Sequence, residues 1–371
     1  MAKSNAWRFT RVKAHLKTLA VVSALCACGG DDAKESGSAG AVVAGDQGAR
    51  IYATISGNDE VTVIDDVSHE VLKSIQVGKG PAILLHSPDY KTLYSANWQD
   101  NTISVIDTTT DQAKSIAVAD RPYVIALSRD GSRLYTGLNN NQIAVIDTAS
   151  QQVVQSFDTD ALAASIIVSP DGKTLYVATI GLGAGTLRAL SATDGSQLKS
   201  PIEVGGSPAW ITIGQDGSKV YTLNFLSDDV SVVDTASFSV QKTIQTGMGS
   251  LGIIGNVTPD GARLYVTNYG AAELIGIDTA TNEIVQHIPL HGRPVGINFD
   301  QAGERLYVTD FGPDSLAESP LSGSQFLLSG KYTATYAGQV SVFARETGEQ
   351  IGDSIAVGPG ATSVVVVPAA K

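Results

Sequence analysis

The stretch Arg263–Thr279, RLYVTNYGAAELIGIDT, decides how the whole chain is interpreted, because related versions of it recur along the sequence. Each version centres on a tyrosine, and successive tyrosines lie 41–45 residues apart, at Tyr52, Tyr94, Tyr135, Tyr176, Tyr221, Tyr265 and Tyr307. Seven units of this length predict a repeat architecture in which each unit buries its apolar face only against its neighbours. The repeat therefore predicts the architecture, and it says much less about the activity.

Each unit contains four short runs of β-prone residues separated by turn residues. In the third unit these runs are 123–128, 134–136, 143–147 and 153–157. Asp-Gly pairs such as Asp130-Gly131 predict tight hairpins between the first and second runs. The third run often ends in Asp-Thr, and we interpret its aspartates as turn residues that accept hydrogen bonds from backbone amides, without any metal. These aspartates are Asp107, Asp147, Asp234 and Asp278.

The two ends of the repeat array complement each other. The first run, 50–54, has the character of a second strand, whereas the last run, 361–367, has that of a first strand. We expect the C-terminal strand to complete a sheet whose other three strands come from residues 50–77, which would close the ring and remove open edges. The prediction is a single all-β domain over residues 49–371: a seven-bladed β-propeller of four-stranded antiparallel blades.

The motifs LYVTN, ISVIDT, SPDGK and Gly-x-x-Pro resemble those of the YVTN-repeat β-propeller family, a WD40-like group, over about residues 50–368. The resemblance implies a seven-bladed ring of the kind found in extracytoplasmic bacterial proteins and surface-layer proteins. Related rings occur in quinoprotein amine dehydrogenase subunits and in lactonases. The match weakens in the fourth unit, where SATDG replaces the Asp-Thr turn, and in the seventh, where Arg345-Glu346-Thr347 does.

The N-terminal region has the form of an export signal. Residues 1–28 combine basic residues, an apolar run too short to span a membrane, and small residues. The segment LCAC at 25–28 resembles the bacterial lipobox, which implies cleavage before Cys28 and lipidation of that residue; an ordinary cleavable signal is the alternative. Residues 29–48 are small, polar and glycine-rich, so they predict a flexible tether. We expect an extracytoplasmic lipoprotein, at the outer membrane or facing the periplasm, or otherwise a secreted or periplasmic protein.

Composition and spacing give little sign of catalysis. The formal net charge is −12, so general attraction to nucleic acid phosphates is not expected. Both cysteines lie within residues 26–28, which leaves none for a metal site or disulfide in the repeats. Three histidines, His69, His86 and His287, lie apart in the chain without metal-ligand spacing, and GLGAG at 181–185 is interpreted as a loop. No catalytic residue, metal or cofactor is predicted.

A candidate ligand site lies where loops gather at one mouth of the central channel. Loops that lead into the first strands of blades 2, 3 and 7 bring cations to one arc, and an insertion at 311–338 projects over the same arc. We predict that this arc binds a small anionic or sugar-like ligand. Its candidate residues are Lys79, Trp98, Arg121, Trp210, His291 and Arg293. The alternative is that the cations bind backbone carbonyls or pair with acids such as Asp120.

A second set of residues ends the second strands. Asparagine or aspartate is expected to end each strand by turn bonding, and the following aromatic residue is expected to cover a neighbouring blade. Stacking of Trp98 or Trp210 on a ligand is the alternative. The pairs are Asn97-Trp98, Asn224-Phe225, Asn268-Tyr269 and Asp310-Phe311.

The leading functional prediction is a monomeric, lipid-anchored scaffold that offers a rigid face to an envelope protein or to a small anionic or sugar-like ligand. Its membrane contact would be through the lipid alone. The alternative is an enzyme, either a lactonase-like hydrolase or a dehydrogenase-associated quinoprotein-type subunit, for which only His291 with Glu318 can be nominated as an acid–base pair. Binding of single-stranded nucleic acid would need cations and stacking aromatics, and the acidic chain argues against it.

Overall fold

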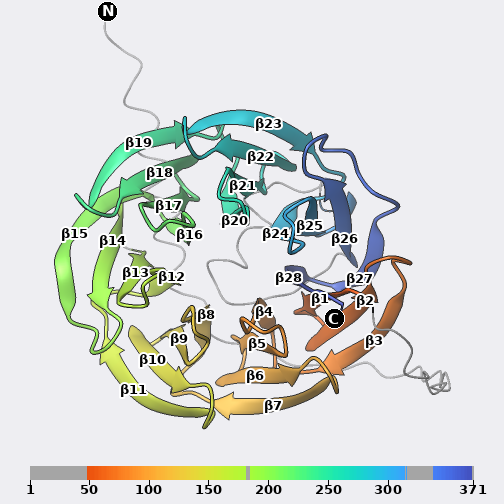
Figure 1. Ribbon diagram of the computed structural model, residues 1–371, viewed down its shortest axis with the longest axis horizontal. Helices are drawn as coiled ribbons and strands as arrows, with labels where there is room; N and C mark the ends of the chain where they lie inside the picture. The colour runs from red at the N-terminus through yellow and green to blue at the C-terminus, as the bar shows by residue number, and fades with distance from the viewer. Residues whose placement is uncertain (1–47, 181–183, 314, 316–336, 370–371) are drawn as a thin grey trace, which may run out of the picture. The chain divides into compact units, whose positions relative to one another are not determined.

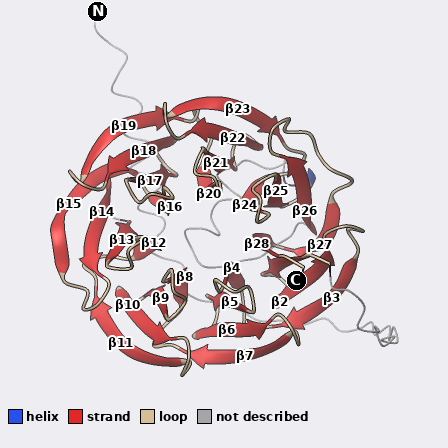
Figure 2. Cartoon of the chain, in the orientation of Figure 1, coloured by secondary structure: helices blue, strands red, loops and turns tan. Residues whose placement is uncertain are grey.

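The computed structural model describes residues 48–180, 184–313, 315 and 337–369. The predicted signal segment with Cys28, almost all of the predicted tether and the middle of the predicted insertion lie outside these residues. Within them, seven four-stranded sheets form a ring around a central axis (Figures 1 and 2). The ring belongs to a compact unit that spans Asp46–Lys371. The predicted all-β, seven-bladed propeller is therefore confirmed.

The strands of blades 1 to 4 follow in order from the channel outward. Blade 1 contains β28 (Ala361–Val367), β1 (Arg50–Ile55), β2 (Glu60–Asp65) and β3 (Val71–Gln76). Blade 2 contains β4 (Pro81–His86), β5 (Thr92–Asn97), β6 (Thr102–Asp107) and β7 (Gln112–Ala117). Blade 3 contains β8 (Pro122–Leu127), β9 (Arg133–Leu138), β10 (Gln142–Asp147) and β11 (Gln152–Asp158). Blade 4 contains β12 (Ala163–Val168), β13 (Thr174–Thr179), β14 (Ala184–Ser191) and β15 (Gln197–Gly206).

The remaining three blades repeat this order. Blade 5 contains β16 (Pro208–Ile213), β17 (Lys219–Asn224), β18 (Asp229–Asp234) and β19 (Ser239–Gln245). Blade 6 contains β20 (Gly252–Val257), β21 (Arg263–Asn268), β22 (Glu273–Asp278) and β23 (Glu283–Pro289). Blade 7 contains β24 (Pro294–Phe299), β25 (Arg305–Asp310), β26 (Ala337–Ala344) and β27 (Ile355–Pro359). The long connection predicted in the seventh unit therefore joins β25 to β26.

The ring closes through blade 1, which combines both ends of the repeat array. The C-terminal β28 pairs antiparallel with β1, so that Ile51 lies opposite Val366 and Tyr52 lies opposite Val365. This pairing gives the first blade the inner strand that the N-terminal repeat lacks. The closure predicted from the sequence is confirmed, and it leaves no inner-strand edge open between the first and last repeats.

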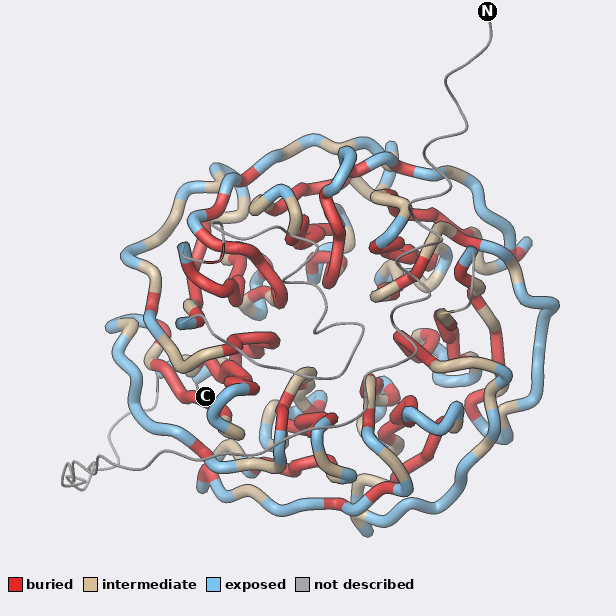
Figure 3. The backbone as a smooth tube through the Cα atoms, turned by 180° about the vertical axis from the view of Figure 1, so that it is seen from behind, coloured by how far each residue is buried: buried red, intermediate tan, exposed pale blue. Residues whose placement is uncertain are grey.

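The centre of each second strand, a tyrosine preceded by an aliphatic residue, is buried on both faces because each blade packs between two others. In β21, Leu264 and Val266 pack in a cluster with Tyr221 of blade 5. Between them, Tyr265 points the other way and lies 6.0 Å from the ring of Phe299 in blade 7. Alternation along the strand therefore aims the tyrosine at the following blade. The outermost strands are largely exposed, whereas the strands inside them are largely buried (Figure 3).

The tyrosine hydroxyls bond across the seams between blades. The Tyr135 hydroxyl donates to the carbonyl of Ala192 at 3.2 Å. The Tyr265 hydroxyl lies 3.2 Å from the carbonyl of Arg345, and it also lies 2.7 Å from Gln286 Oε1 in its own blade. Each of the two carbonyls lies in the turn between the third and fourth strands of the next blade. The aromatic ring of each tyrosine is buried among apolar side chains, while its hydroxyl is hydrogen-bonded. This is the usual arrangement for a buried tyrosine.

The two seams that flank blade 1 use carboxylates instead. Tyr307 donates to Asp66 at 2.6 Å, and Arg305 Nη1 lies 3.1 Å from the same carboxylate. On the other side of blade 1, Tyr52 donates to Asp111 at 3.0 Å, and Asp111 also pairs with Arg50 at 3.0 Å. The blade that closes the ring is thus held to both neighbours by charge-assisted hydrogen bonds, which are stronger than neutral ones.

The turn chemistry predicted for the aspartates is confirmed. Asp278 accepts hydrogen bonds from the amides of Ala280 at 3.0 Å and Thr281 at 2.8 Å, and its pKa is lowered chiefly by the bond from Thr281. Asp107, Asp147 and Asp234 accept bonds from nearby amides in the same way. At the Asp-Gly hairpins, Gly131 adopts a φ of 73°, a conformation that glycine takes at little cost. These carboxylates therefore shape turns. Among the described residues, no helix has the length and apolar character needed to cross a membrane.

Candidate ligand site at the top mouth of the channel

We call the side of the ring that carries the loops leading into the inner strands the top face. At this face each inner strand begins with a register shift against its neighbouring strand. In blade 5 the shift lies between Pro208 and Trp210, so that Ala209 is the extra residue of a β-bulge. Comparable shifts occur in the other six blades. A bulge turns two consecutive side chains toward the same side, whereas a regular strand would send them to opposite faces.

The bulges line a pocket at the top mouth of the central channel. The second residue of every inner strand contributes to it: Ala82, Tyr123, Ala164, Ala209, Ile253, Val295 and Thr362. In four blades the third residue of the inner strand lines it as well: Ile83, Val124, Trp210 and Ile254. The pocket has a volume of about 90 Å³. The seven-fold repeat therefore supplies equivalent positions around one pocket, and the residues at those positions differ from blade to blade.

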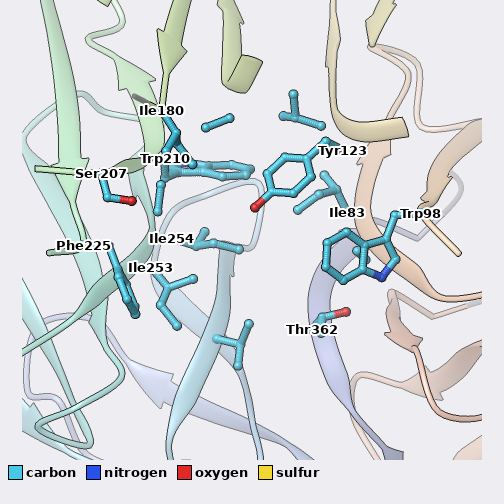
Figure 4. Close-up of a pocket in the computed structure, with 15 residues that line it drawn as sticks. Ile83, Trp98, Tyr123, Ile180, Ser207, Trp210, Phe225, Ile253, Ile254 and Thr362 are labelled. Carbon is cyan, nitrogen blue, oxygen red and sulfur yellow. The ribbon is translucent and has the colours of Figure 1, made fainter. Parts of the chain in front are cut away.

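Four aromatic residues make this pocket asymmetric. Trp98 and Phe225 follow the second strands of blades 2 and 5, whereas Tyr123 and Trp210 come from the inner strands of blades 3 and 5. The rings of Trp98 and Tyr123 meet edge to face, with centroids 5.6 Å apart and planes at 62°. Figure 4 shows Tyr123 between Trp98 and Trp210. The blade 2, 3 and 5 side of the mouth is aromatic, while the blade 7 and 1 side carries Val295 and Thr362.

The two indole groups carry buried donors without acceptors. Trp98 Nε1 and Trp210 Nε1 are both shielded from solvent, and neither has an acceptor within hydrogen-bonding distance in the described part of the chain. The Trp98 residue as a whole is 9% exposed. A buried donor left unpaired costs about 1–3 kcal/mol, so each one calls for an explanation such as a ligand or an ordered water.

No described side chain that lines the pocket carries a formal charge. Besides the two indole N–H groups, its polar side-chain groups are the hydroxyls of Tyr123, Ser207 and Thr362. Burial raises the pKa of Tyr123 to about 12, so this hydroxyl stays protonated at neutral pH. Thr362 Oγ1 lies 2.9 Å from Thr54 Oγ1 and 3.3 Å from the carbonyl of Pro81. The pocket is therefore suited to an uncharged group.

The structure divides the candidate residues predicted from the sequence. Trp98 and Trp210 line the same pocket, whereas the four cationic or histidine candidates do not line it. Lys79 is exposed, and its backbone amide donates to Asp100 at 2.9 Å. Arg121 is also exposed, with Nε 3.9 Å from Asp120 Oδ1. This last contact is the acid pairing that the sequence left open as an alternative.

Arg293 is buried, at 6% exposure, and its guanidinium holds backbone carbonyls. Its Nη1 donates to the carbonyls of Tyr269 at 3.1 Å and Gly270 at 3.0 Å, while Nε donates to the carbonyl of Ser315 at 3.0 Å. The guanidinium also lies over the Tyr269 ring at 5.5 Å. These contacts match the structural role considered as the alternative, and contact of Arg293 with a ligand stays a prediction.

The pairs at the ends of the second strands also separate into two groups. Tyr269 and Phe311 pack edge to face with centroids 6.1 Å apart, which joins blades 6 and 7 as expected. Trp98 and Phe225 instead line the pocket. The preceding Asn97 and Asn224 are buried and donate to Ser104 and Ser231, each at 2.9 Å. These asparagines therefore bond across to the third strand of their blade, whereas turn bonding was predicted from the sequence.

Asp310 occupies the corresponding position in blade 7. It is 2% exposed, and burial raises its pKa to about 6. Its Oδ1 accepts a hydrogen bond from the amide of Gly312 at 2.6 Å. His291, which is exposed, acts on this carboxyl electrostatically and favours its charged form. Where blades 2, 5 and 6 have a neutral asparagine, blade 7 thus has a carboxyl group that titrates near neutral pH.

The bottom mouth of the channel holds a larger cavity, of about 560 Å³, and two asparagines that line it bond between blades. Asn256 Nδ2 donates to the carbonyl of Ile297 at 2.8 Å, and Asn298 Nδ2 donates to that of Val364 at 3.1 Å. Both bonds connect neighbouring inner strands. His86 stacks on Tyr90 at 4.2 Å, and burial lowers its pKa. The described residues also contain no group of three or more His, Cys, Asp or Glu side chains suited to a metal.

Sequence comparison supports the class that this geometry defines. No family model matches the chain. It is 27% identical over 262 residues to the "Seven-bladed beta-propeller protein Rv1057" of Mycobacterium tuberculosis, covering 60% of this chain and 65% of the relative. It is 24% identical over 246 residues to "Antigen Lp49" of Leptospira interrogans, covering 60% of this chain and 53% of the relative. The chain thus matches between about half and two thirds of the length of these relatives. It is a seven-bladed β-propeller protein.

Solved structures support the fold alone. The Kuenenia stuttgartiensis hydrazine synthase matches with a TM-score of 0.59 and 19% identity, covering 69% of this chain and 91% of that one. The dihydro-heme d1 dehydrogenase NirN, in complex with DHE, matches with a TM-score of 0.57 and 14% identity, covering 89% and 77%. At such low identity, a shared ring does not imply a shared reaction.

Proposed function

We propose that this chain is an exported, lipid-anchored, monomeric β-propeller of the YVTN-repeat type. In this proposal it acts at the cell envelope as a binding scaffold without a catalytic role. The pocket at the top mouth carries the proposal, because its described lining is apolar and aromatic and holds no charged side chain. Pockets of this kind, with a few placed polar groups, are typical of ligand sites. Binding of a protein partner at the same face is the other form of the scaffold role.

Export is supported by the sequence of residues 1–28 and by the relative named as an antigen. An antigen is met by antibodies, which is easiest for a protein outside the cytoplasm. Because the segment at 25–28 resembles a lipobox, we propose Cys28 as the lipidated residue. Anchoring through the lipid alone would leave the propeller free in the aqueous phase at the end of the tether.

The test is metabolic labelling of the full chain with an alkyne-bearing palmitate in a bacterial host. The wild-type chain is expected to take up the label and to fractionate with membranes. Cys28→Ala should remove the label, whereas Cys26→Ala, two residues away, should retain it. Label on the Cys28→Ala variant would contradict the proposed anchor, and recovery of unlabelled wild-type chain in the periplasm would indicate plain secretion.

The enzymatic alternative has no specific observation in its favour. Glu318, one half of the acid–base pair nominated from the sequence, lies outside the described residues. His291, the other half, is exposed and does not line the pocket. Turnover of a lactone panel, with and without added divalent metal, tests this alternative directly.

A further inference from the structure

We propose that the top mouth binds an uncharged aromatic group bearing a hydrogen-bond-accepting oxygen, such as an aryl ketone, between Trp98 and Trp210. This inference deepens the proposed binding role and rests on it, because it names the class of ligand and the side of the mouth that holds it. Three features of the described lining point to this ligand: the placement of the aromatic rings, the lack of charge, and the unpaired indole donors.

The rings are placed for contact with a flat group. The bulge in β16 turns Trp210 into the channel beside Ala209, and the bulge in β8 does the same for Tyr123. Trp98 meets Tyr123 edge to face, which leaves the aromatic surface on one side of the mouth (Figure 4). Aromatic pairs favour offset-stacked and edge-to-face geometries, so an inserted ring finds both kinds of partner here.

The lining excludes a charged group. A carboxylate or ammonium ion in this pocket would lose water without gaining a counter-ion, because the described lining carries no charge. The exposed cations of the same face, Lys79 and Arg121, do not line the pocket. The pocket therefore favours a neutral ligand over the anionic ligand that the sequence suggested for the arc.

The indole donors add a requirement for an acceptor. Trp98 Nε1 and Trp210 Nε1 have no acceptor among the described residues, and both indoles line the pocket. A carbonyl oxygen can accept from an indole N–H, whereas a plain hydrocarbon leaves it unpaired. Since both indole nitrogens are shielded from solvent, the two indole rings must shift slightly for the ligand's acceptor to reach them. Trp210 is half-buried, and it lines both the pocket and the cavity below it, so it has room to move.

The volume limits the size of the inserted group. The pocket, at about 90 Å³, is smaller than a cavity of about 150 Å³ that holds benzene in another protein. The pocket therefore holds at most a single ring, and any larger part of the ligand remains in the mouth. Acetophenone, which has one ring and one ketone, is the matching probe.

Tryptophan fluorescence reports on this site selectively. The chain has three tryptophans, Trp7, Trp98 and Trp210, and the last two line the pocket. In the full chain with Trp7→Phe, the whole tryptophan signal therefore comes from the pocket. Titrations would be followed by fluorescence, and dissociation constants would be measured independently by ligand-observed NMR.

Four probes separate the three requirements. Acetophenone is expected to bind about tenfold more tightly than toluene, which lacks the acceptor, as one hydrogen bond predicts. It should also bind at least about tenfold more tightly than benzoate, which is charged, and more tightly than cyclohexyl methyl ketone, which lacks the aromatic ring. Benzoate binding as tightly as acetophenone, or no binding of acetophenone up to its solubility limit, would overturn the inference.

Variants in the Trp7→Phe background assign the effect to the two indoles. Trp210→Ala should weaken acetophenone binding at least about tenfold by removing a contact surface. Trp98→Phe with Trp210→Phe keeps both rings, and it should abolish the preference for acetophenone over toluene. Arg121→Ala, which lies outside the lining, is the matched control and should change binding less than twofold. Equal weakening by Arg121→Ala and Trp210→Ala would place the ligand elsewhere and refute the proposal.

The outcomes remain separate from those of the labelling experiment. Loss of palmitate label with intact acetophenone binding would remove the lipid anchor and leave the ligand site. Intact labelling with no acetophenone binding would remove the ligand class and leave an exported scaffold. Circular dichroism of each variant confirms that the ring is folded, and the double phenylalanine variant provides the test if Trp210→Ala does not fold.

Discussion

The seams between blades and the top mouth both depend on aromatic residues with a polar tip, but they treat that tip in opposite ways. At the seams the tyrosine hydroxyls are paired, as between Tyr307 and Asp66 at 2.6 Å. At the mouth the N–H groups of Trp98 and Trp210 have no acceptor among the described residues. Paired tips stabilise the ring, whereas unpaired tips reduce stability and are available to a ligand. Positions where the repeats agree therefore hold the scaffold together, and the proposed binding site uses positions where they differ.

The largest effect is expected at a seam beside the closing blade. Asp66→Ala should lower the free energy of unfolding by about 4 kcal/mol, because it leaves the buried Tyr307 hydroxyl unpaired and removes the partner of Arg305. Urea unfolding followed by circular dichroism measures the change. Glu70→Ala, on the same turn but exposed, is the control and should stay within about 0.5 kcal/mol of wild type. A loss at Asp66 no greater than that of the control would show that the charged seam contributes little.

Arg293 and Arg121 were predicted together as ligand contacts, but we expect their substitutions to differ strongly in their effect on stability. Arg293→Ala is expected to cost about 3 kcal/mol, because three carbonyls lose a buried donor. Arg121→Ala should change stability by less than about 0.5 kcal/mol, since its ion pair is exposed and long. Thermal and urea unfolding of the two variants in parallel provide the measurement. Similar small losses in both would mean that Arg293 is not structural, and would return it to the list of ligand contacts.

At Asp310, in contrast to the two sites above, we expect a substitution to increase stability. Its pKa is raised from 3.8 to about 6, so the folded chain binds this proton more tightly than the unfolded chain does. Its contribution to stability is therefore full below about pH 4, falls as the pH rises to about 6, and stays low above that. The shift corresponds to about 3 kcal/mol at most.

Asp310→Asn should remove this loss. The asparagine copies the arrangement of blade 2, in which Asn97 donates to Ser104 across the strand pair, and Ser341 stands at the matching place in blade 7. We expect the variant to be more stable than wild type by about 2 kcal/mol at pH 8 and nearly equal to it at pH 4. Asp353→Asn, at an exposed site of the same blade, is the control and should change stability by less than about 0.5 kcal/mol. A variant that is less stable at pH 8 would indicate that the carboxylate has a partner it needs.

The sequence predicted the scaffold well because the repeat carries its signal in local residues. The tyrosine spacing gave seven units, the Asp-Gly pairs marked the hairpins, and the strand character of residues 361–367 predicted closure through β1. These features depend on neighbours in the chain or on the repeat period. For that reason they could be recognised without coordinates.

The pocket could be predicted only in part. Trp98 and Trp210 were candidates, but Tyr123 was not, although it is the one aromatic residue at the second position of an inner strand. Regular alternation would place Tyr123 and Val124 on opposite faces, and only the bulge turns both toward the channel. The inward orientation of the Arg293 side chain could not be predicted from the sequence either, because it depends on carbonyls 23 and 24 residues away in the chain. Aligning the copies at the first residue of each inner strand, which is proline in four of the seven blades, would have exposed the Tyr123 exception.

The smallest effect tests whether charge matters at the seams. Tyr135→Phe removes a neutral bond to the carbonyl of Ala192 and should cost about 1 kcal/mol, whereas Tyr307→Phe removes a bond to a carboxylate and should cost about 2 kcal/mol. Both variants keep the aromatic ring, so differences in packing are small. Urea unfolding therefore measures the contribution of the hydroxyl group to stability. Equal losses would mean that the closing blade is held no more firmly than the others. A larger loss at Tyr307 would show that the seams around blade 1 are reinforced. Blade 1 is the one blade whose four strands are not consecutive in the chain, because β28 joins β1 through hydrogen bonds alone.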